Sequence, residues 1–349
     1  MAARPGSGHS VIMMRTLLIL MSMFSLAGCA TPFIQAEMAP PPGFTGPRIE
    51  DPVLAGTPGA FIVDDAARLP FLRWGPQAAD MVIVALHGMN DYSAAFHLAG
   101  PAWADRGIAT YAYDQRGFGG APGRGLWAGE TRMTQDLRTV VALVRARHPE
   151  ATVAVIGESM GGAVAISAFA SDVPPSADCV ILLAPAVWGW SSQSLPNRLS
   201  LRIAAGLFGD RAVEPPDWAV REIRATDNLI QLVRNGTDPV FIRNTRFDTL
   251  SGLVDLRESA ARNLVRMQVP TLLMYGARDD IIEPRPMRRA LGRSGVPANL
   301  QTAWYAQGYH LLNRDLQAAT VFRDVEAWLR QPDQPLPSGA PPVLANLPE

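Results

Sequence analysis

The chain has 349 residues, of which 48% are hydrophobic and 18% are charged, and its formal net charge is −1. Because the 31 basic residues are scattered rather than clustered, the composition excludes a protein that binds nucleic acid or another polyanion through a basic surface. The length allows one large α/β domain or two small ones.

The N-terminus has the pattern of a secretory signal. Arg15 precedes an apolar stretch, Leu17 to Leu26, that is too short to span a bilayer as a helix. The stretch ends in the sequence LAGC, which resembles the bacterial lipobox, whose cysteine is diacylated and becomes the first residue after cleavage. We therefore expect residues 1–29 to be a lipoprotein signal peptide ending at a lipidated Cys29. The alternative is an ordinary signal peptide in which Cys29 is incidental.

Two further segments flank the expected domain. By resemblance to lipoproteins, Ala30 in place of an aspartate favours the outer membrane, so we expect a lipid-anchored protein of the bacterial cell envelope that faces the periplasm. Residues 30–59 are rich in Pro and Gly and predict a linker. The proline-rich residues 332–349 predict a C-terminal tail without packed structure. Cys179, in the apolar run CVILLAP, is predicted to be a buried small hydrophobe.

Residues 60–331 predict one domain in which short apolar runs alternate with longer amphipathic stretches. A parallel sheet with crossover helices requires this order, so we expect an α/β fold with a mostly parallel central sheet and helices on both faces. The expected strands are 81–88, 108–114, 152–159, 179–185, 270–276 and 300–305. The expected helices include 94–106, 130–148, 160–170 and 314–330.

Residues 187–245 lie within a long interval that interrupts this alternation. A single helix would normally join the strands on either side, so we expect an inserted, mostly helical cap over the carboxyl ends of the strands, where ligands of open α/β sheets bind. The candidates to line an apolar substrate channel there are Trp188, Trp190, Leu195, Leu207 and Phe208. The alternative is that these side chains pack the cap against the body of the domain.

The sequence GESMGG (157–162) follows an apolar strand and opens a run of helix formers. A serine on a sharp strand-to-helix turn has strained backbone angles and needs small residues two positions before and after it, which Gly157 and Gly161 supply. The turn also places Ser159 at the amino end of a helix, where backbone N–H groups favour developing negative charge. We therefore expect Ser159 to be a catalytic nucleophile.

A serine nucleophile needs a histidine as its base. Of the five histidines, His9 precedes the signal, His148 ends a charged helix, and His97 lies within a helical stretch. His310 follows the last expected strand and precedes the last helix, which agrees with a triad in the order serine, acid, histidine. His310 is therefore the expected base, and His87 is expected to shape the loop that contains it.

The acid should follow the strand that precedes this histidine, and GARDDIIEP supplies Asp279 and Asp280 there. We expect Asp279 to hold the imidazole in its useful tautomer, with Asp280 as the second choice. The oxyanion of an acyl-transfer intermediate needs two backbone donors, one after the first apolar strand and one after the nucleophile. We assign these donors to Met89 and Met160.

In chain order the motifs are HGMN, DQRGFG, GESMGG, GARDDIIEP and YHLLNRD. With them the chain resembles the monoacylglycerol lipase and lysophospholipase group of α/β-hydrolases, which also includes enzymes of the serine aminopeptidase type. The resemblance covers roughly residues 60–330. It implies hydrolysis of the carboxylic ester of a single-chain lipid, without a metal or organic cofactor. The segment HGMNDYSAAF lacks the glycine-glutamate-histidine continuation usual in this group, and the cap shows no close match, so the substrate stays open.

Two other functions fit the same residues. A peptidase or amidase of this fold, such as a prolyl aminopeptidase, would use the same triad and would need carboxylates in the cap to bind a free amine. The cap residues available for that role are Glu214, Asp217, Glu222 and Asp227. A catalytically silent envelope lipoprotein that binds lipids is the second alternative. The sequence does not distinguish oligomeric states.

Overall fold

The computed structural model describes residues 32–54, 57–215, 223–292 and 295–348. The predicted signal peptide and Cys29 lie outside the described residues. None of the helices in the described ranges combines the length and the apolar composition that a bilayer-spanning segment needs.

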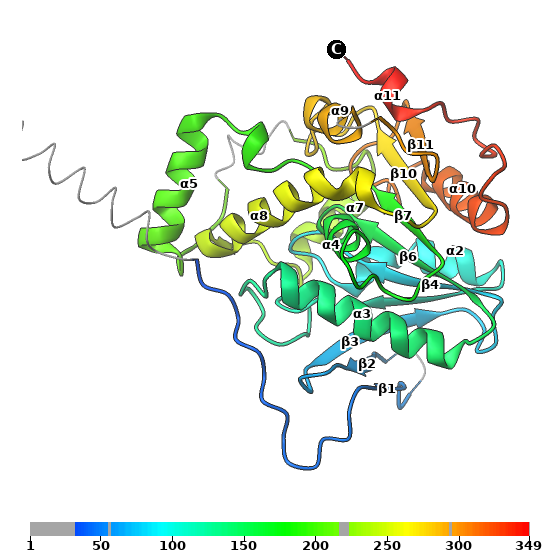
Figure 1. The fold of residues 1–349 in the computed structure, drawn as a ribbon, viewed down its shortest axis with the longest axis horizontal. Helices are drawn as coiled ribbons and strands as arrows, with labels where there is room; N and C mark the ends of the chain where they lie inside the picture. The colour runs from blue at the N-terminus through cyan, green and yellow to red at the C-terminus, as the bar shows by residue number, and fades with distance from the viewer. Residues whose placement is uncertain (1–31, 55–56, 216–222, 293–294, 349) are drawn as a thin grey trace, which may run out of the picture.

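A nine-stranded sheet forms the centre of the described chain, with strand order β1-β2-β3-β5-β4-β6-β7-β10-β11 (Figure 1). The strands are β1 (Arg48–Glu50), β2 (Gly59–Ile62), β3 (Arg68–Trp74), β4 (Met81–Leu86), β5 (Ile108–Tyr113), β6 (Thr152–Glu158), β7 (Cys179–Leu183), β10 (Thr271–Gly276) and β11 (Leu300–Tyr305). Strands β5 to β11 in this order run parallel, whereas β1, β2 and β3 pair antiparallel at one side. The parallel part of the sheet contains all six predicted strands, so the predicted fold class is confirmed.

Helices cover both faces of the sheet. On one face lie α3 (Glu130–Arg147), α4 (Met160–Phe169) and α8 (Phe247–Asn263), and on the other lie α2 (Ala99–Ala104) and α10 (Ala318–Arg330) (Figure 1). Successive strand residues point to opposite faces, so Val82 of β4 joins the first core and Ile83 joins the second. Each core therefore receives alternate residues of the same apolar strands.

The remaining elements are short or belong to the inserted segment. They are η1 (Ser93–Phe96), η2 (Trp190–Ser192), α5 (Leu195–Phe208), β8 (Ala212–Val213), α7 (Leu229–Thr237), β9 (Thr245–Arg246), η3 (Leu264–Arg266), α9 (Pro284–Gly292) and α11 (Val343–Asn346). Between β7 and β10 the chain forms α5, α7 and an antiparallel ribbon of β8 with β9 before it returns through α8. The ribbon was not predicted, because two-residue strands carry no periodicity.

The N-terminal part of the domain differs from the prediction. Strand β1 lies within residues 30–59, which were expected to be a linker without regular structure, and that expectation is wrong there. Gln35 also packs onto the body, since its backbone N–H donates to Trp127 O over 2.8 Å and its side-chain Nε2 donates to Leu126 O over 2.8 Å. A three-residue strand is too short for its pattern to stand out from a Pro- and Gly-rich context.

The C-terminal residues were expected to lack packed structure, and this prediction is also wrong. Val343 is fully buried and Leu347 is 4% exposed. The tail runs along β11, the edge strand of the sheet, where Trp304 N–H donates to Pro341 O over 2.8 Å and Val343 N–H donates to Thr302 Oγ1 over 3.0 Å. An exposed strand edge has unpaired donors and acceptors, and here the tail supplies partners for them.

Candidate active site

Ser159 lies on the turn between β6 and α4. Its backbone has φ +52° and ψ −113°, a conformation that is strained for any residue with a Cβ atom. Two hydrogen bonds hold it there: its N–H donates to Leu183 O over 3.0 Å, and its C=O accepts from Ala186 N–H over 3.0 Å. The turn thus places a serine, 6% exposed, at the N-terminus of a helix.

The glycines around the serine are required by close backbone contacts. A Cβ atom on Gly157 would lie 2.5 Å from Gly161 O, and a Cβ atom on Gly161 would overlap Leu86 O at the end of β4. A Cβ atom on Gly88 would lie only 3.3 Å from the Cβ atom of Ser159. The absence of side chains at these positions lets the turn and the loop after β4 pack together.

His310 lies in the loop between β11 and α10, where it is 3% exposed. Its Nδ1 is 2.9 Å from Asp279 Oδ2 in the loop after β10. The other carboxylate oxygen, Asp279 Oδ1, accepts hydrogen bonds from the N–H groups of Ile281 and Ile282, each over 2.8 Å. The carboxylate is thus fixed from both sides, and the contact at Nδ1 leaves Nε2 of the imidazole available for another partner.

The two adjacent aspartates, Asp279 as the expected acid and Asp280 as the second choice, have different partners in the structure. Asp279 contacts the imidazole, whereas Asp280 Oδ2 accepts a hydrogen bond from Arg224 N–H over 3.2 Å and points toward the segment before α7. Asp279 is therefore the carboxylate that lies beside His310.

Of the two predicted oxyanion donors, Met160 follows Ser159 in the chain, and Met89 belongs to the loop after β4 that packs against the serine. Met160 is the first residue of α4, so its N–H has no partner within the helix and lies at the positive end of the helix dipole. Met89 follows Gly88, the residue that packs against the Cβ atom of Ser159. This arrangement suits a negatively charged oxygen next to the serine.

His87 shapes the loop that carries Met89. Its Nε2 accepts a hydrogen bond from Gln115 N–H over 3.0 Å, and its Nδ1 lies 2.7 Å from Gly88 O. Complete burial lowers the pKa of His87, so the ring is neutral in this setting. Both ring nitrogens have structural partners, which links the loop after β4 to the DQRGFG turn.

A buried charge network that the sequence did not predict connects the loops of the site. The guanidinium of Arg314 donates to Asp91 Oδ2 over 2.6 Å and to Glu158 Oε1. Arg314 and Glu158 are each 1% exposed and Asp91 is 6% exposed. Glu158 directly precedes Ser159, and Arg314 follows His310 by four residues. A charged residue at the end of a buried strand, as in GES, needs a buried partner, and this was the available signal.

Charge and burial act in opposite directions on Glu158. Its burial raises the pKa of the carboxyl group, and the positive charge of Arg314 counteracts that rise. The network thus places the histidine loop beside the residue that precedes the serine.

The predicted channel residues lie in the inserted segment. Trp190 Nε1 donates to Asp255 Oδ1 of α8 over 2.6 Å, and the ring of Trp188 lies 5.7 Å from the guanidinium carbon of Arg257, also in α8. Packing against α8 therefore explains the positions of both tryptophan side chains. Leu207 and Phe208 are 45% and 42% exposed at the end of α5, and Leu195 is 75% exposed at its start.

A hollow of about 440 Å³ opens next to the loop that carries Met89. It is lined by Asn90, Glu214, Pro215, Asn235, Gly236, Phe241, Ile242 and Arg243. Asn90, in the loop after β4, is hydrogen-bonded to the inserted segment: the Asn90 C=O accepts from Ile242 N–H over 2.9 Å, and Asn90 Nδ2 donates to Thr245 Oγ1 over 2.8 Å. The inserted segment and the loop after β4 thus form one concave surface.

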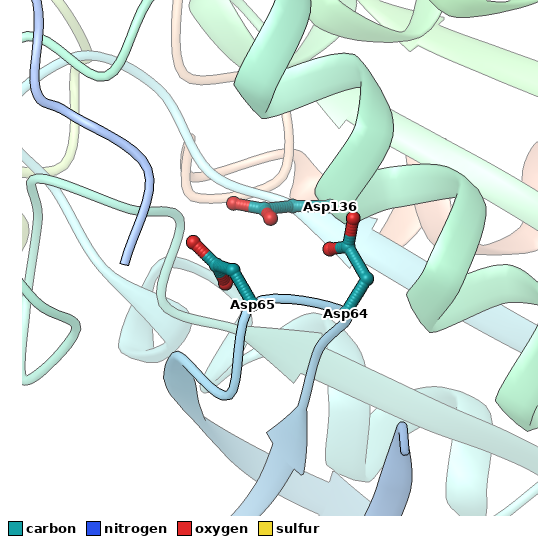
Figure 2. Close-up of side chains that lie close together, drawn as sticks. All are labelled: Asp64, Asp65 and Asp136. Atoms are coloured by element: carbon teal, nitrogen blue, oxygen red, sulfur yellow. The ribbon is translucent and has the colours of Figure 1, made fainter. Parts of the chain in front are cut away.

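Three carboxylates elsewhere lie close enough together to hold a cation: Asp64, Asp65 and Asp136 (Figure 2). Arg116 is buried beside them and donates to both Asp65 and Asp136 over 2.8–2.9 Å, and Arg132 donates to Asp64 over 3.1 Å. Burial would raise the pKa of Asp65, but hydrogen bonds from Arg116 and a backbone N–H lower it overall. The arginines therefore supply the positive charge, and this is a structural ion cluster.

Comparisons with known proteins agree with this architecture. Residues 77–317 match the family model described as Hydrolase_4, serine aminopeptidase, S33. The chain is 25% identical over 281 residues to a monoacylglycerol lipase of Mycolicibacterium smegmatis, covering 79% of this chain and 95% of that protein. It is 22% identical to a human monoglyceride lipase, covering 77% and 89% of the two chains.

Solved structures show the same fold at lower sequence identity. The monoacylglycerol lipase of Paleococcus ferrophilus superposes with a TM-score of 0.61 at 18% identity, covering 75% of this chain and 98% of that one. A monoglyceride lipase of Saccharomyces cerevisiae superposes with a TM-score of 0.62 at 17% identity, covering 84% and 98%.

Proposed function

Because the chain belongs to the serine aminopeptidase, S33 family of α/β-hydrolases, we propose that it is a serine hydrolase that cleaves carboxylic esters of single-chain lipids, either monoacylglycerols or lysophospholipids. The observation that carries the proposal is the strained Ser159 turn together with a buried His310 whose Nδ1 contacts Asp279. Relatives named monoacylglycerol or monoglyceride lipase support the substrate class.

In this proposal the reaction has two acyl-transfer stages. The Oγ atom of Ser159 attacks the ester carbonyl carbon while Nε2 of His310 takes its proton, and Asp279 stabilises the imidazolium. The N–H groups of Met89 and Met160 bind the oxyanion. The ester C–O bond then breaks, and His310 returns the proton to the departing alcohol. Water repeats the sequence on the acyl-enzyme and releases the fatty acid.

Hydrolysis of an amide is the second candidate, because the family description names an aminopeptidase. That reaction would need cap carboxylates that bind an amine. Asp227 Oδ1 already accepts a hydrogen bond from Leu316 N–H over 2.9 Å, whereas Glu214 lines the hollow beside Asn90. Asp217 and Glu222 lie outside the described residues. One carboxylate at the hollow gives less support to an aminopeptidase than the lipase relatives give to an esterase.

The test is a substrate panel with matched variants. Wild-type protein should hydrolyse monoacylglycerols, lysophospholipids or p-nitrophenyl esters in preference to prolyl and aminoacyl naphthylamides. Ser159→Ala should lose turnover and labelling by a fluorophosphonate, and Asp280→Asn should keep both. Labelling of the folded wild type also separates an enzyme from a silent lipid-binding protein. Turnover by Ser159→Ala, or a preference for naphthylamides, would contradict the proposal.

We also propose that the enzyme is a lipoprotein of the bacterial outer membrane, diacylated at Cys29 and facing the periplasm. The LAGC sequence and Ala30 support this location. The mass of the N-terminal peptide from the mature protein should correspond to an acylated Cys29. Cys29→Ser should lose the incorporation of labelled fatty acid without changing the activity on a dissolved ester. An unmodified cysteine in membrane-extracted protein would exclude the anchor.

A further inference from the structure

Helix α5 turns an apolar face away from the rest of the protein. We define the α5 face as Leu195, Leu199, Ile203 and Leu207, which recur at every fourth position and so lie on one side of the helix. Leu195, Leu199 and Leu207 are 75%, 40% and 45% exposed, whereas Ala205 on the opposite side is 6% exposed. A surface helix normally buries its apolar stripe against its own domain, so this arrangement calls for an apolar partner outside it.

The charge on the same helix restricts the chemistry of that partner. Residues 195–208 contain Arg198 and Arg202 and no acidic residue. The guanidinium of Arg202 lies 5.0 Å from the ring of Trp190, at the side of the helix. An apolar face with cationic side chains next to it matches an interfacial helix on a membrane that contains anionic lipids.

The first described residues lie next to the end of this helix. The ring of Phe33 lies 5.8 Å from the guanidinium carbon of Arg246 in β9, and Arg246 pairs with Ala212 in β8. One residue before β8, the guanidinium of Arg211 lies 4.8 Å from the ring of Phe208, the last residue of α5. Figure 1 likewise shows the described chain beginning beside the lower end of α5.

The distance from the expected anchor to this point is short. Four residue steps separate Cys29 from Phe33, and an extended chain of that length spans at most about 14 Å. Helix α5, with 14 residues, is about 21 Å long. A diacylated Cys29 therefore keeps Phe33 within about 14 Å of the lipid anchor, and the contacts of Phe33 place the end of α5 near it. Phe33 is itself 48% exposed beside that end.

From the tether and the α5 face together, we infer that α5 lies in the headgroup region of the membrane that holds Cys29, with the α5 face in contact with lipid. This inference rests on the proposed lipid anchor. It fixes which side of the enzyme faces its membrane, because the short tether and the apolar face are at the same place. The occupant of the α5 face is thus the bilayer surface.

The test measures the environment of single probes in the full-length, acylated protein. Leu199→Cys is labelled with an environment-sensitive fluorophore after reconstitution into vesicles of phosphatidylethanolamine and phosphatidylglycerol. Val173→Cys is the matched control, because Val173 is 68% exposed and lies in the loop between α4 and β7, at the amino ends of the parallel strands. Cys179 does not interfere, since it is buried and burial raises the pKa of its thiol to about 12.

We expect the Leu199 probe to shift to shorter wavelength on vesicles and to be quenched strongly by brominated lipids, whereas the Val173 probe shows neither change. Protein that floats with the vesicles while both probes report water would overturn the inference, and so would protein that does not float at all. A shift without quenching by brominated lipids would also overturn it, because it would assign the α5 face to a second copy of the chain.

A kinetic comparison separates this inference from the proposed function. Leu199→Asp should keep wild-type turnover of a dissolved short-chain ester and should lose severalfold activity on a monoacylglycerol held in vesicles. Ser159→Ala should lose both. If the wild type hydrolyses neither substrate but the Leu199 probe is quenched, the proposed function fails and the membrane contact stands. Equal vesicle activity of Leu199→Asp and wild type would count against the contact.

Discussion

Replacing Arg314 with methionine tests the buried network directly. The change keeps a long, unbranched side chain but removes the positive charge that Glu158 and Asp91 share. Removing one partner from a buried ion pair typically destabilises a protein by about 3–5 kcal/mol, because the remaining charge stays buried without compensation. Two carboxylates lose their partner here, so we expect a loss of about 5 kcal/mol, near the upper end of that range.

The expected loss is large enough to measure by urea or thermal unfolding. For a domain of this size, 1 kcal/mol corresponds to about 2–4 °C in Tm, so Arg314→Met should melt about 10–20 °C below the wild type. Arg330→Met is the matched control, because the Arg330 side chain is 47% exposed and pairs with Glu326 at the surface. An exposed pair of this kind contributes about 0–1 kcal/mol.

A double-mutant cycle then isolates the pair. Glu158→Gln removes one of the two carboxylates, so Arg314→Met should cost less in that background, by about 1–3 kcal/mol. Arg314→Lys should be intermediate, because an ammonium group cannot reproduce the planar fork that reaches both acids. If Arg314→Met were as stable as Arg330→Met, or if the cycle were additive, the network would not join these loops as described.

The other predictions concern packing, pH and thiol chemistry. Gly161→Ala should cost about 1–3 kcal/mol and most of the activity, because its Cβ would overlap Leu86 O, whereas Gly236→Ala in α7 has open space and should be neutral or stabilising by up to about 1 kcal/mol in urea unfolding. Burial raises the pKa of Asp315 from 3.8 to about 6, so the folded state favours its neutral form. That stabilisation amounts to about 3 kcal/mol, is complete below pH 3.8 and is lost as pH rises through about 6. The free energy of unfolding of the wild type should therefore decline from pH 4 to 7, and Asp315→Asn should lack this part of the decline. Cys179 should resist iodoacetamide at pH 8 in native protein and react fully after denaturation, because it is 5% exposed and burial raises its pKa to about 12.

The parts of the fold that the sequence predicted are those with local or repeated patterns. The six apolar strands stood out because strands covered on both faces are apolar along their whole length. The Ser159 turn stood out because its steric needs fall on Gly157 and Gly161, within two residues of the serine. The contact of His310 with Asp279 followed from the fixed order of elements in this fold.

The parts that the sequence did not predict depend on contacts between distant residues. Arg314 lies 223 residues from Asp91 and 156 residues from Glu158, and one sequence gives no rule for pairing a buried arginine with particular acids. The contact of Asp280 with Arg224 N–H was likewise not predicted, because the two residues are 56 positions apart in the chain. Strand β1 was missed because its neighbours supply the hydrogen bonds that define it.

The packing of the C-terminal tail, residues 332–348, along β11 has a consequence for solubility. Without residues 332–348, Trp304 N–H and the adjacent backbone groups of β11 would be free to pair with a strand of another molecule. Such exposed strand edges promote intermolecular β-pairing and fibre growth. The tail forms hydrogen bonds with this edge strand, and its prolines have no backbone N–H to donate to a further strand. No additional strand can therefore pair readily at this edge of the sheet. A composition that looks unsuited to structure is therefore well suited to terminating a sheet.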